Sequence, residues 1–193
     1  MDIFYKGLKI SLSENVYPPA EDSFMLADAA YKAGEVLEVG CGSGLVSLSW
    51  AKNNNVTAVD INPEAVKCTR QNARKNKLKI TAFESNLFSK VIGKFDAILF
   101  NPPYLPTSEE EILDGEINRA YDGGPDGRKI LDHFLAEFSK YLKPDGSLLL
   151  VQSSLNDYDE TIAKLGELGF KTEILDKQEF FFEKIFLLKA SSK

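Results

Sequence analysis

One segment of the sequence has the residue types needed to hold a planar nitrogen group. Asn101-Pro102-Pro103-Tyr104 directly follows Phe95 to Phe100, an apolar run typical of a buried strand. Each proline fixes its own φ and restricts the residue before it to extended geometry, so this loop should be stiff. The side-chain carbonyl of Asn101 and the main-chain carbonyl of Pro102 can then accept hydrogen bonds from an NH2 group.

Such a loop would suit methyl transfer to that NH2 group if the chain also binds a methyl sulfonium donor. The lone pair of an amide or aromatic amine is delocalised and therefore a weak nucleophile. Two acceptors that hold its protons and aim the nitrogen at a methyl sulfonium supply positioning and polarisation, so no strong base is needed. Tyr104 can stack on the planar group and exclude water. A plain turn would also use Pro and Asn. We predict Asn101, Pro102 and Tyr104 as catalytic residues and Asn101, Pro102, Pro103 and Tyr104 as substrate-binding residues.

A second segment, Val36 to Gly44, has the composition of a nucleotide-binding turn. An apolar strand leads into Gly40, Gly42 and Gly44, and glycines let the backbone turn sharply and a ligand approach without a Cβ atom. A dinucleotide fingerprint would place its third glycine one residue later. The spacing therefore favours S-adenosylmethionine over NAD, although a purely structural turn would carry the same glycines.

Two acidic residues strengthen the prediction of a cofactor site. Glu38 lies inside an otherwise apolar strand, where a carboxylate needs a cationic or hydrogen-bonded partner. The ammonium group of the cofactor's methionine part would be such a partner. Asp60 ends the next strand, where it can accept hydrogen bonds from ribose hydroxyls. The alternative role for Asp60 is to cap the following helix together with Asn62.

Apolar β-rich runs alternate with amphipathic stretches, which is the pattern of a parallel sheet covered by helices on both faces. The turn between the last two strands is too short for a parallel crossover, so these strands should pair antiparallel. We predict an α/β chain with the Rossmann-like fold of class I S-adenosylmethionine methyltransferases and a seven-stranded, mostly parallel sheet with an antiparallel last strand. The expected strands are Val36–Val39, Val56–Asp60, Lys79–Phe83, Phe95–Phe100, Ser147–Gln152, Phe170–Asp176 and Phe180–Lys189.

The 193 residues suit a single methyltransferase domain. Residues 1–34 form an N-terminal arm, with a short strand at Leu8–Leu12, a Tyr17-Pro18-Pro19 bend and a helix from about Asp22 to Tyr31, and residues 35–193 form the catalytic core. Asn62 should cap a helix that has Pro63 at its first position. A helical stripe from Leu131 to Leu142 should end at Pro144-Asp145-Gly146.

Composition excludes several classes of protein. A net charge of −6 argues against a surface built to neutralise phosphates, and the basic stretch Arg70 to Lys79 is interpreted as an exposed helix face. Cys41 and Cys68 form neither a zinc motif nor a disulfide framework, and no metal site is expected. The apolar runs are too short for a membrane span, and the N-terminus does not have the layout of a signal peptide. We therefore expect a cytoplasmic enzyme.

The chain resembles the HemK-like, Asn-Pro-Pro-Tyr methyltransferases over nearly its whole length. Beyond the two motifs, Val16 to Phe24, Asp122 to Arg128 and the aromatic strand Phe180 to Leu188 resemble the short archaeal and eukaryotic branch. The resemblance implies methylation of the side-chain nitrogen of glutamine in the Gly-Gly-Gln loop of class I translation release factors. The cofactor contacts implied by the family roles and by the glycine turn are Ser23, Glu38, Gly40, Gly42, Gly44, Asp60, Ile61, Asn86, Leu87 and Asn101.

The family comparison also implies a partner and shows one departure. Members of the short branch resemble subunits of a heterodimer with a small zinc-binding activator protein, whereas bacterial members carry an N-terminal helical domain that has no counterpart in this sequence. At Asn86 the family commonly has aspartate, which accepts from the adenine amino group. The Asn86 side-chain oxygen can still accept, so we predict retained but weaker cofactor binding.

Two other functions remain open on the sequence alone. Methylation of adenine N6 in DNA or RNA would present the same planar NH2 group, but neither a base-flipping region nor a basic stripe is present. A non-catalytic cofactor-binding scaffold would not need the Asn101 to Tyr104 loop. His133 is interpreted as structural, Trp50 and Phe180 to Phe182 as core or sheet-edge residues, and Glu109 to Glu111 as a solvated loop.

Overall fold

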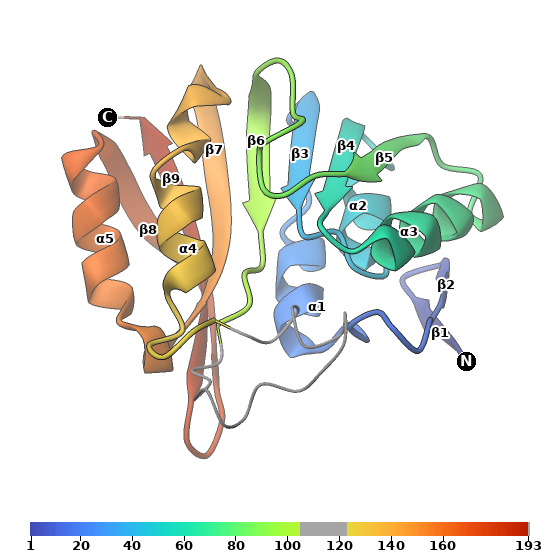
Figure 1. Ribbon diagram of the computed structural model, residues 1–193, viewed down its shortest axis with the longest axis horizontal. Helices are drawn as coiled ribbons and strands as arrows, with labels where there is room; N and C mark the ends of the chain where they lie inside the picture. The colour runs from blue at the N-terminus through green and yellow to red at the C-terminus, as the bar shows by residue number, and fades with distance from the viewer. Residues whose placement is uncertain (105–122, 193) are drawn as a thin grey trace.

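The computed structural model describes residues 1–104 and 123–192 and has a mostly parallel sheet at its centre (Figure 1). Seven strands pair in the order β5-β4-β3-β6-β7-β9-β8, and β9 runs antiparallel to both of its neighbours while the others are parallel. This confirms the predicted α/β fold with one antiparallel strand, the last. The strands are β3 (Glu35–Val39), β4 (Asn55–Asp60), β5 (Ile80–Glu84), β6 (Phe95–Phe100), β7 (Leu142–Ser153), β8 (Phe170–Glu179) and β9 (Lys184–Ser192).

Helices cover both faces of the sheet because each strand alternates its side chains between two apolar cores. On one face, Leu26 and Leu48 pack with Leu99 of β6; on the other, Phe134 and Leu165 pack with Ile98. The helices of the first face are α1 (Glu21–Asp28), α2 (Leu45–Trp50) and α3 (Pro63–Lys75), and those of the second are α4 (Lys129–Leu135) and α5 (Tyr158–Glu167).

The helix before β7 is shorter than the sequence predicts. Helix α4 ends at Leu135, a 3₁₀ turn follows at Phe138–Lys140, and β7 already begins at Leu142. Pro144-Asp145-Gly146 therefore lies inside β7 and does not end the helix. The pairing of β6 with β7 shifts register across this segment, as expected for an irregularity that leaves residues unpaired.

The expected start of the last strand at Phe180 is wrong. Phe180, Phe181 and Phe182 occupy the turn between β8 and β9, where their exposed fractions are 45%, 90% and 84%. The Phe180 main-chain NH donates to the Glu183 carbonyl at 2.7 Å and closes this turn. Three aromatic residues in a strand-like run predict burial, but here they form the exposed tip of a hairpin.

The N-terminal arm has one strand more than expected. β1 (Asp2–Tyr5) and β2 (Leu8–Ser11) form a separate antiparallel hairpin, and α1 ends at Asp28, short of Tyr31. Trp50 is fully buried, as predicted, and its Nε1 donates to the Leu26 carbonyl at 3.1 Å. This contact ties α2 to α1 and so fixes the arm against the sheet.

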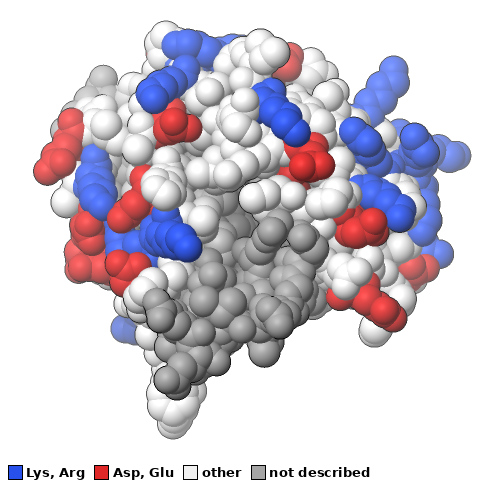
Figure 2. All heavy atoms as spheres, in the orientation of Figure 1, with Lys and Arg blue, Asp and Glu red and all other residues white. Residues whose placement is uncertain are grey.

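The surface agrees with the interpretation that the basic stretch Arg70 to Lys79 includes an exposed helix face. Lys and Arg gather over α3, as Figure 2 shows, and Arg70, Arg74 and Lys75 are exposed there, whereas charges of both signs are mixed elsewhere on that face. Both cysteines are buried and free. His133 lies in α4 with an exposed side chain. Within the described residues, none of the helices is long and apolar enough to span a membrane. The acidic run Glu109 to Glu111 lies outside the described residues.

Candidate active site

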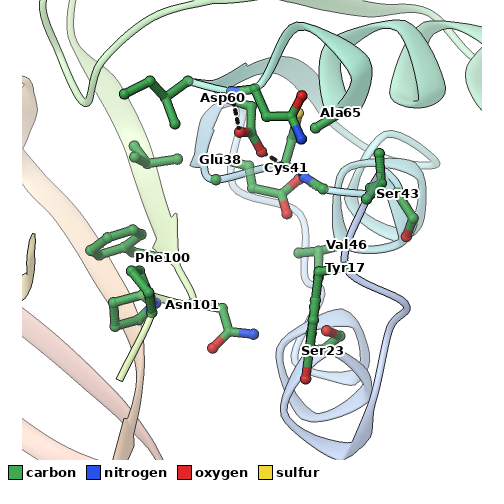
Figure 3. A pocket seen from close by; sticks show the side chains of 18 of the residues that line it. Tyr17, Ser23, Glu38, Cys41, Ser43, Val46, Asp60, Ala65, Phe100 and Asn101 are labelled. Carbon is green, nitrogen blue, oxygen red and sulfur yellow. Dashed lines mark hydrogen bonds between the residues drawn. The ribbon is translucent and has the colours of Figure 1, made fainter. Parts of the chain in front are cut away.

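A cavity of about 390 Å³ lies at the carboxyl ends of β3, β4 and β6 (Figure 3). Parallel strands present their carboxyl ends at one edge, and loops following them form the ligand crevice of doubly wound sheets. Figure 3 shows Glu38 and Asp60 close together on one side, with Asn101 reaching toward Ser23 and Tyr17 on the other. The predicted residues on its wall are Ser23, Glu38, Gly40, Gly42, Asp60, Ile61, Asn86, Leu87, Asn101, Pro102, Pro103 and Tyr104.

The glycine turn after β3 opens the cavity to a ligand. Gly40 and Gly42 have φ of 74° and 51°, which favours glycine, and no described atom lies within 4 Å of a Cβ built on Gly42. Gly44 is not on the wall. Its φ is 84°, and an added Cβ would lie 2.8 Å from Oγ1 of Thr69, so glycine is needed there for packing between α2 and α3.

Asp60 is held in place by main-chain donors. Its carboxylate accepts from the Gly42 NH and from the Asn62 NH, both at 2.9 Å, which links the glycine turn to the end of β4. Burial raises the pKa of Asp60, and these hydrogen bonds oppose the rise. The capping role belongs to Asn62, whose side chain accepts from the Glu64 NH at 2.9 Å. Asp60 therefore remains oriented toward the cavity.

Glu38 is buried and adjacent to the same turn. The residue is only 4% exposed, and the Ser47 hydroxyl donates a hydrogen bond to its carboxyl group. Burial raises the pKa of Glu38 to about 8, the nearby Asp60 charge adds to this, and the Ser47 hydrogen bond opposes it. The ionised form of a carboxyl group buried in this way is stabilised most by a cation that enters beside it.

The Asn-Pro-Pro-Tyr loop meets α1 at the opposite wall. Nδ2 of Asn101 donates to Oδ2 of Asp22 at 3.0 Å, and the Tyr104 hydroxyl donates to the same oxygen at 3.2 Å. Oδ1 of Asn101 is buried and has no hydrogen-bond partner among the described residues. Burial raises the pKa of Tyr104, and the charge of Asp22 raises it further. Asn101 thus lines the cavity with its donor end held by Asp22 and with its acceptor end buried and unpaired among the described residues.

The segment before α4 supports the loop from behind. Gly127 has a φ of 70°, and a Cβ there would collide with the carbonyl oxygen of Tyr104. This close approach explains why the segment Asp122 to Arg128, which resembles the HemK-like family, has glycine at this position. Asp122 itself lies outside the described residues. The Asn156 side chain also donates to the Gly127 carbonyl at 3.1 Å.

The turn after β5 carries the last predicted residues. Asn86 and Leu87 both line the cavity, and Leu87 has a φ of 44°, which is uncommon for a residue with a branched side chain. The Ser85 hydroxyl donates to the Leu87 carbonyl at 2.9 Å and accepts from the Lys90 NH at 3.1 Å. These bonds hold the unusual conformation.

Sequence reasoning missed several residues on the wall. Asp22 is the most important because it touches the loop directly; its burial next to Ser23 cannot be read from an amphipathic helix start. The others of this kind include Asn15, Tyr17, Ser43, Val46, Phe100, Lys129 and Ile130. The Tyr17-Pro18-Pro19 bend and the resemblance of Val16 to Phe24 were the signals that the arm returns to the sheet edge.

Solved structures identify the class of protein. The E. cuniculi Mtq2 of a structure described as the Mtq2-Trm112 complex responsible for methylation of the eRF1 translation termination factor superposes with a TM-score of 0.76, at 26% identity over 93% of this chain and 99% of that chain. The T. thermophilus 16S rRNA N2 G1207 methyltransferase shares the fold, with a TM-score of 0.71 at 19% identity over 100% of this chain and 50% of that chain. The fold and the cavity at the sheet edge are those of class I methyltransferases.

Relatives identify the family. Residues 23–182 match the methyltransferase small domain. A putative protein N5-glutamine methyltransferase of Methanocaldococcus jannaschii is 49% identical over 98% of both chains. Methyltransferase HEMK2 of Homo sapiens is 36% identical over 85% of this chain and 84% of that protein. The chain belongs to the methyltransferase small domain family, within its HemK-like group, which confirms the resemblance drawn from the motifs.

Proposed function

We propose that the protein transfers a methyl group from S-adenosylmethionine to the side-chain nitrogen of a glutamine in the Gly-Gly-Gln motif of a class I release factor. The observation that carries this proposal is the buried, unpartnered Oδ1 of Asn101. A buried acceptor without a partner is costly, so the site favours a ligand that brings an N–H donor. A primary amide brings two. The names of the relatives, which include a release factor glutamine methyltransferase of Geobacter sulfurreducens at 29% identity, support the same acceptor.

The cavity walls fit S-adenosylmethionine. Gly42 leaves room for a ligand beside the main chain, and Asp60 faces the cavity with oxygens suited to ribose hydroxyls. Glu38, buried and with a raised pKa, would gain an ion pair with the ammonium group of the methionine part. Asn86 and Leu87 would hold the adenine end, beyond β5. When bound, this cofactor supplies an electrophilic methyl group.

The protein's own contribution is to position the acceptor nitrogen. Oδ1 of Asn101 and the carbonyl oxygen of Pro102 would each accept one N–H of the amide, which fixes its plane and turns its nitrogen toward the cofactor side of the cavity. These hydrogen bonds also polarise the N–H bonds, so electron density on nitrogen rises. The Tyr104 ring would cover the amide and exclude water.

The proposal also includes a partner protein and a location in the cell. The solved relative Mtq2 is seen with Trm112. We propose that this chain likewise forms a heterodimer with a small zinc-binding activator protein. Methylation of a release factor would take place in the cytoplasm. Co-expression tests the partnership: a chain that is monomeric, soluble and fully active without any second subunit contradicts it.

Transfer of a labelled methyl group tests the activity. Purified protein, with its partner, is incubated with labelled S-adenosylmethionine and either a release factor or nucleic acid. Label should enter the release factor, and replacement of the Gly-Gly-Gln glutamine by alanine should abolish it. Label in nucleic acid alone would support adenine methylation instead, and no label in either would support a non-catalytic scaffold.

The Asn101→Ala variant tests the site. Loss of one positioned acceptor should lower kcat by about 100- to 1,000-fold, while cofactor affinity measured by calorimetry changes little. Asn53→Ala is the matched control because Asn53 is exposed and outside the cavity wall. Unchanged transfer by Asn101→Ala contradicts the proposed role.

A further inference from the structure

Asp22 lies at the centre of a hydrogen-bond cluster that joins three parts of the chain. Its Oδ2 accepts from Nδ2 of Asn101 at 3.0 Å, from the Tyr104 hydroxyl at 3.2 Å and from the Tyr17 hydroxyl at 3.4 Å. Its Oδ1 accepts from the Ser23 main chain at 2.6 Å. Asp22 itself is only 4% exposed. A carboxylate with so little access to water interacts strongly with the donors around it.

The cluster decides which way the Asn101 amide faces. An amide group has a donor end and an acceptor end, and an ionised carboxylate can only accept. Nδ2 of Asn101 must therefore face Asp22, and Oδ1 must point away from Asp22; Oδ1 is buried without a partner among the described residues. Rotation of the amide by half a turn would place two acceptors against each other beside Asp22 and would present an NH2 group to the substrate.

We propose that Asp22 is a positioning residue that locks Asn101 as an acceptor and so makes the site select substrates that present N–H groups. This inference rests on the proposed function, because it explains how the same site distinguishes a glutamine amide from a glutamate carboxylate. A carboxylate would bring a further set of acceptors to Oδ1 of Asn101, whereas an amide brings the missing donor. The Tyr104 hydroxyl donates to the same oxygen of Asp22, so Asp22 fixes the positions of both the Tyr104 ring and the Asn101 amide.

The test compares Asp22→Asn with Asp28→Asn. Both residues belong to α1, but the Asp28 side chain is 45% exposed and pairs with Lys6 away from the cavity. The amide introduced by Asp22→Asn can show either of its ends to Asn101, so the lock is lost. Asp22→Asn should lower kcat by about 10- to 100-fold, the effect of losing a hydrogen bond to a charged group, and Asp28→Asn should leave it unchanged.

A double-mutant cycle separates positioning from general structure. Once Asn101 is replaced by alanine, there is no amide to orient, so Asp22→Asn should cost little further in kcat. A release factor with glutamate in place of the target glutamine should inhibit Asp22→Asn more strongly than the wild type. Equal losses with and without Asn101, or equal inhibition of both proteins, overturn the inference.

The cluster can also be observed without any substrate. The side-chain NH2 protons of Asn101, held by a buried carboxylate, should exchange slowly with deuterated water in the wild-type protein and show one fixed orientation by NMR. Fast exchange would overturn the inference even if Asp22→Asn failed to fold. If the wild type methylates no release factor while this exchange is slow, the proposed function is wrong. The conclusion that Asp22 fixes the orientation of the Asn101 amide would still hold.

A second inference comes from the tip of the β8–β9 hairpin. Phe181 and Phe182 are 90% and 84% exposed, and their rings contact each other edge to face with centroids 4.5 Å apart. Because β8 is parallel to β7, its end and the following turn lie at the carboxyl edge of the sheet, the edge that holds the cavity, as Figure 1 shows. The Lys184 NH donates to Oγ of Ser154 at 3.0 Å and holds the base of the hairpin to the end of β7.

The base of this hairpin lies near the substrate wall of the cavity, because Tyr104 packs against the apolar cluster that contains Ile185 of β9. Glu183, the next residue, is near enough for its charge to raise the pKa of Tyr104, and its Oε1 is buried without a partner among the described residues. A protein that delivers a glutamine side chain to Asn101 must rest on the rim beside Tyr104. Exposed aromatic side chains at such a rim are the usual anchors of a protein contact.

We infer that Phe181 and Phe182 bind the folded protein that carries the acceptor glutamine. This inference also rests on the proposed function. The double variant Phe181→Ser/Phe182→Ser should raise KM for the whole release factor by about tenfold or more and leave cofactor affinity unchanged. Phe4→Ser is the matched control because Phe4 is 77% exposed on β1 and is not on the cavity wall.

Direct binding assays complete the test. Immobilised wild-type enzyme should retain the release factor, and the double Phe variant should not. An unchanged KM, or loss of the activator subunit or of self-association instead of substrate binding, overturns the inference. If wild-type enzyme binds the release factor without methylating it, the proposed reaction fails and the binding surface stands.

Discussion

The hydroxyl group of Ser47 in α2 donates a hydrogen bond to the buried carboxyl group of Glu38 in β3. Glu38 is 4% exposed, and its pKa is raised to about 8, mainly by burial. At neutral pH, most copies of this carboxyl group are therefore protonated before a ligand enters. At this pH, a cation that enters beside Glu38 would make the ionised form favourable, and the Ser47 hydrogen bond favours the same form.

Cofactor affinity should therefore depend on pH. Binding of an ammonium group beside Glu38 requires ionisation, so the association constant should rise by about tenfold per pH unit while the pH stays below the pKa of about 8. Calorimetry in buffers with different ionisation enthalpies should show release of a proton on binding. Glu38→Gln should bind more weakly and lose the pH dependence. A flat affinity between about pH 6 and 7.5 in the wild type contradicts this account.

The same raised pKa affects stability in the opposite direction. Because the folded pKa of Glu38 lies above the ordinary value of 4.5, its contribution is fully present below pH 4.5 and is lost as pH rises through about 8. The cofactor-free protein should thus lose free energy of unfolding across this range, and saturating cofactor should restore it. Urea unfolding of wild type and Glu38→Gln, with and without cofactor, measures both effects.

Two glycines of one turn should respond differently to alanine. Gly44→Ala places a Cβ 2.8 Å from Oγ1 of Thr69 at a φ of 84°, so it should lower the free energy of unfolding by about 2–4 kcal/mol. Gly42→Ala meets no described atom within 4 Å and should cost only about 1–2 kcal/mol of backbone strain. Its Cβ enters the cavity, so cofactor affinity should fall more than in Gly44→Ala. If Gly42→Ala destabilised the fold more than Gly44→Ala, or if Gly44→Ala lost more cofactor affinity, the roles assigned to these two glycines would be wrong.

The fold class was largely predictable because the central strands β3, β6 and β7 contain apolar runs and amphipathic stretches alternate with the strands. The errors occur where local pattern and tertiary structure compete. Phe180 to Phe182 have strong strand propensity, but the pairing of β8 with β9 places them in a turn. Pro144 signals a helix end, yet α4 ends earlier and Pro144 falls within β7. Whether an aromatic run is buried depends on the pairing register of its strand, and amino-acid composition does not specify that register.

The position of the candidate site was predictable wherever a motif lies at a strand end, although the roles of its residues remain predictions. Glu38, Asp60 and Asn101 all follow this rule, and the structure brings them to one cavity. Asp22 could not be found in this way because its contact with Asn101 spans 79 residues. Gly44 is the opposite case. Its spacing in the motif suggests a ligand contact, but its close packing against Thr69 of α3 explains why glycine is needed there.

Asn86 offers a test of cofactor binding at the adenine end. It is exposed at the end of the cavity that follows β5, where its side-chain oxygen can accept a hydrogen bond. A carboxylate is a stronger acceptor than an amide, so Asn86→Asp should tighten cofactor binding by a few-fold, about 1 kcal/mol. Calorimetry measures the change, with Asn53→Asp as the control because Asn53 is exposed away from the cavity wall. No gain for Asn86→Asp counts against an adenine contact at this position.

Arg128 should be among the residues whose loss most strongly destabilises the fold. It is 4% exposed, and Nη1 donates to the carbonyls of Asn156 and Asp157, both at 2.8 Å, while Nη2 donates to Oδ1 of Asp132 at 2.9 Å. Removing the cation leaves these acceptors without their donor. Arg128→Met should therefore lower the free energy of unfolding by about 3–5 kcal/mol.

An exposed ion pair provides the comparison for Arg128. Lys67 and Glu64 are separated by 3.4 Å with side chains 62% and 43% exposed, so Lys67→Met should change the free energy of unfolding by less than about 0.5 kcal/mol. Urea unfolding at constant m value compares the two variants. Because Arg128 anchors the segment whose Gly127 packs against the Tyr104 carbonyl, folded Arg128→Met should also transfer methyl groups more slowly while binding the cofactor normally. Equal stability of the two variants would show that the network around Arg128 does not hold this segment to α5.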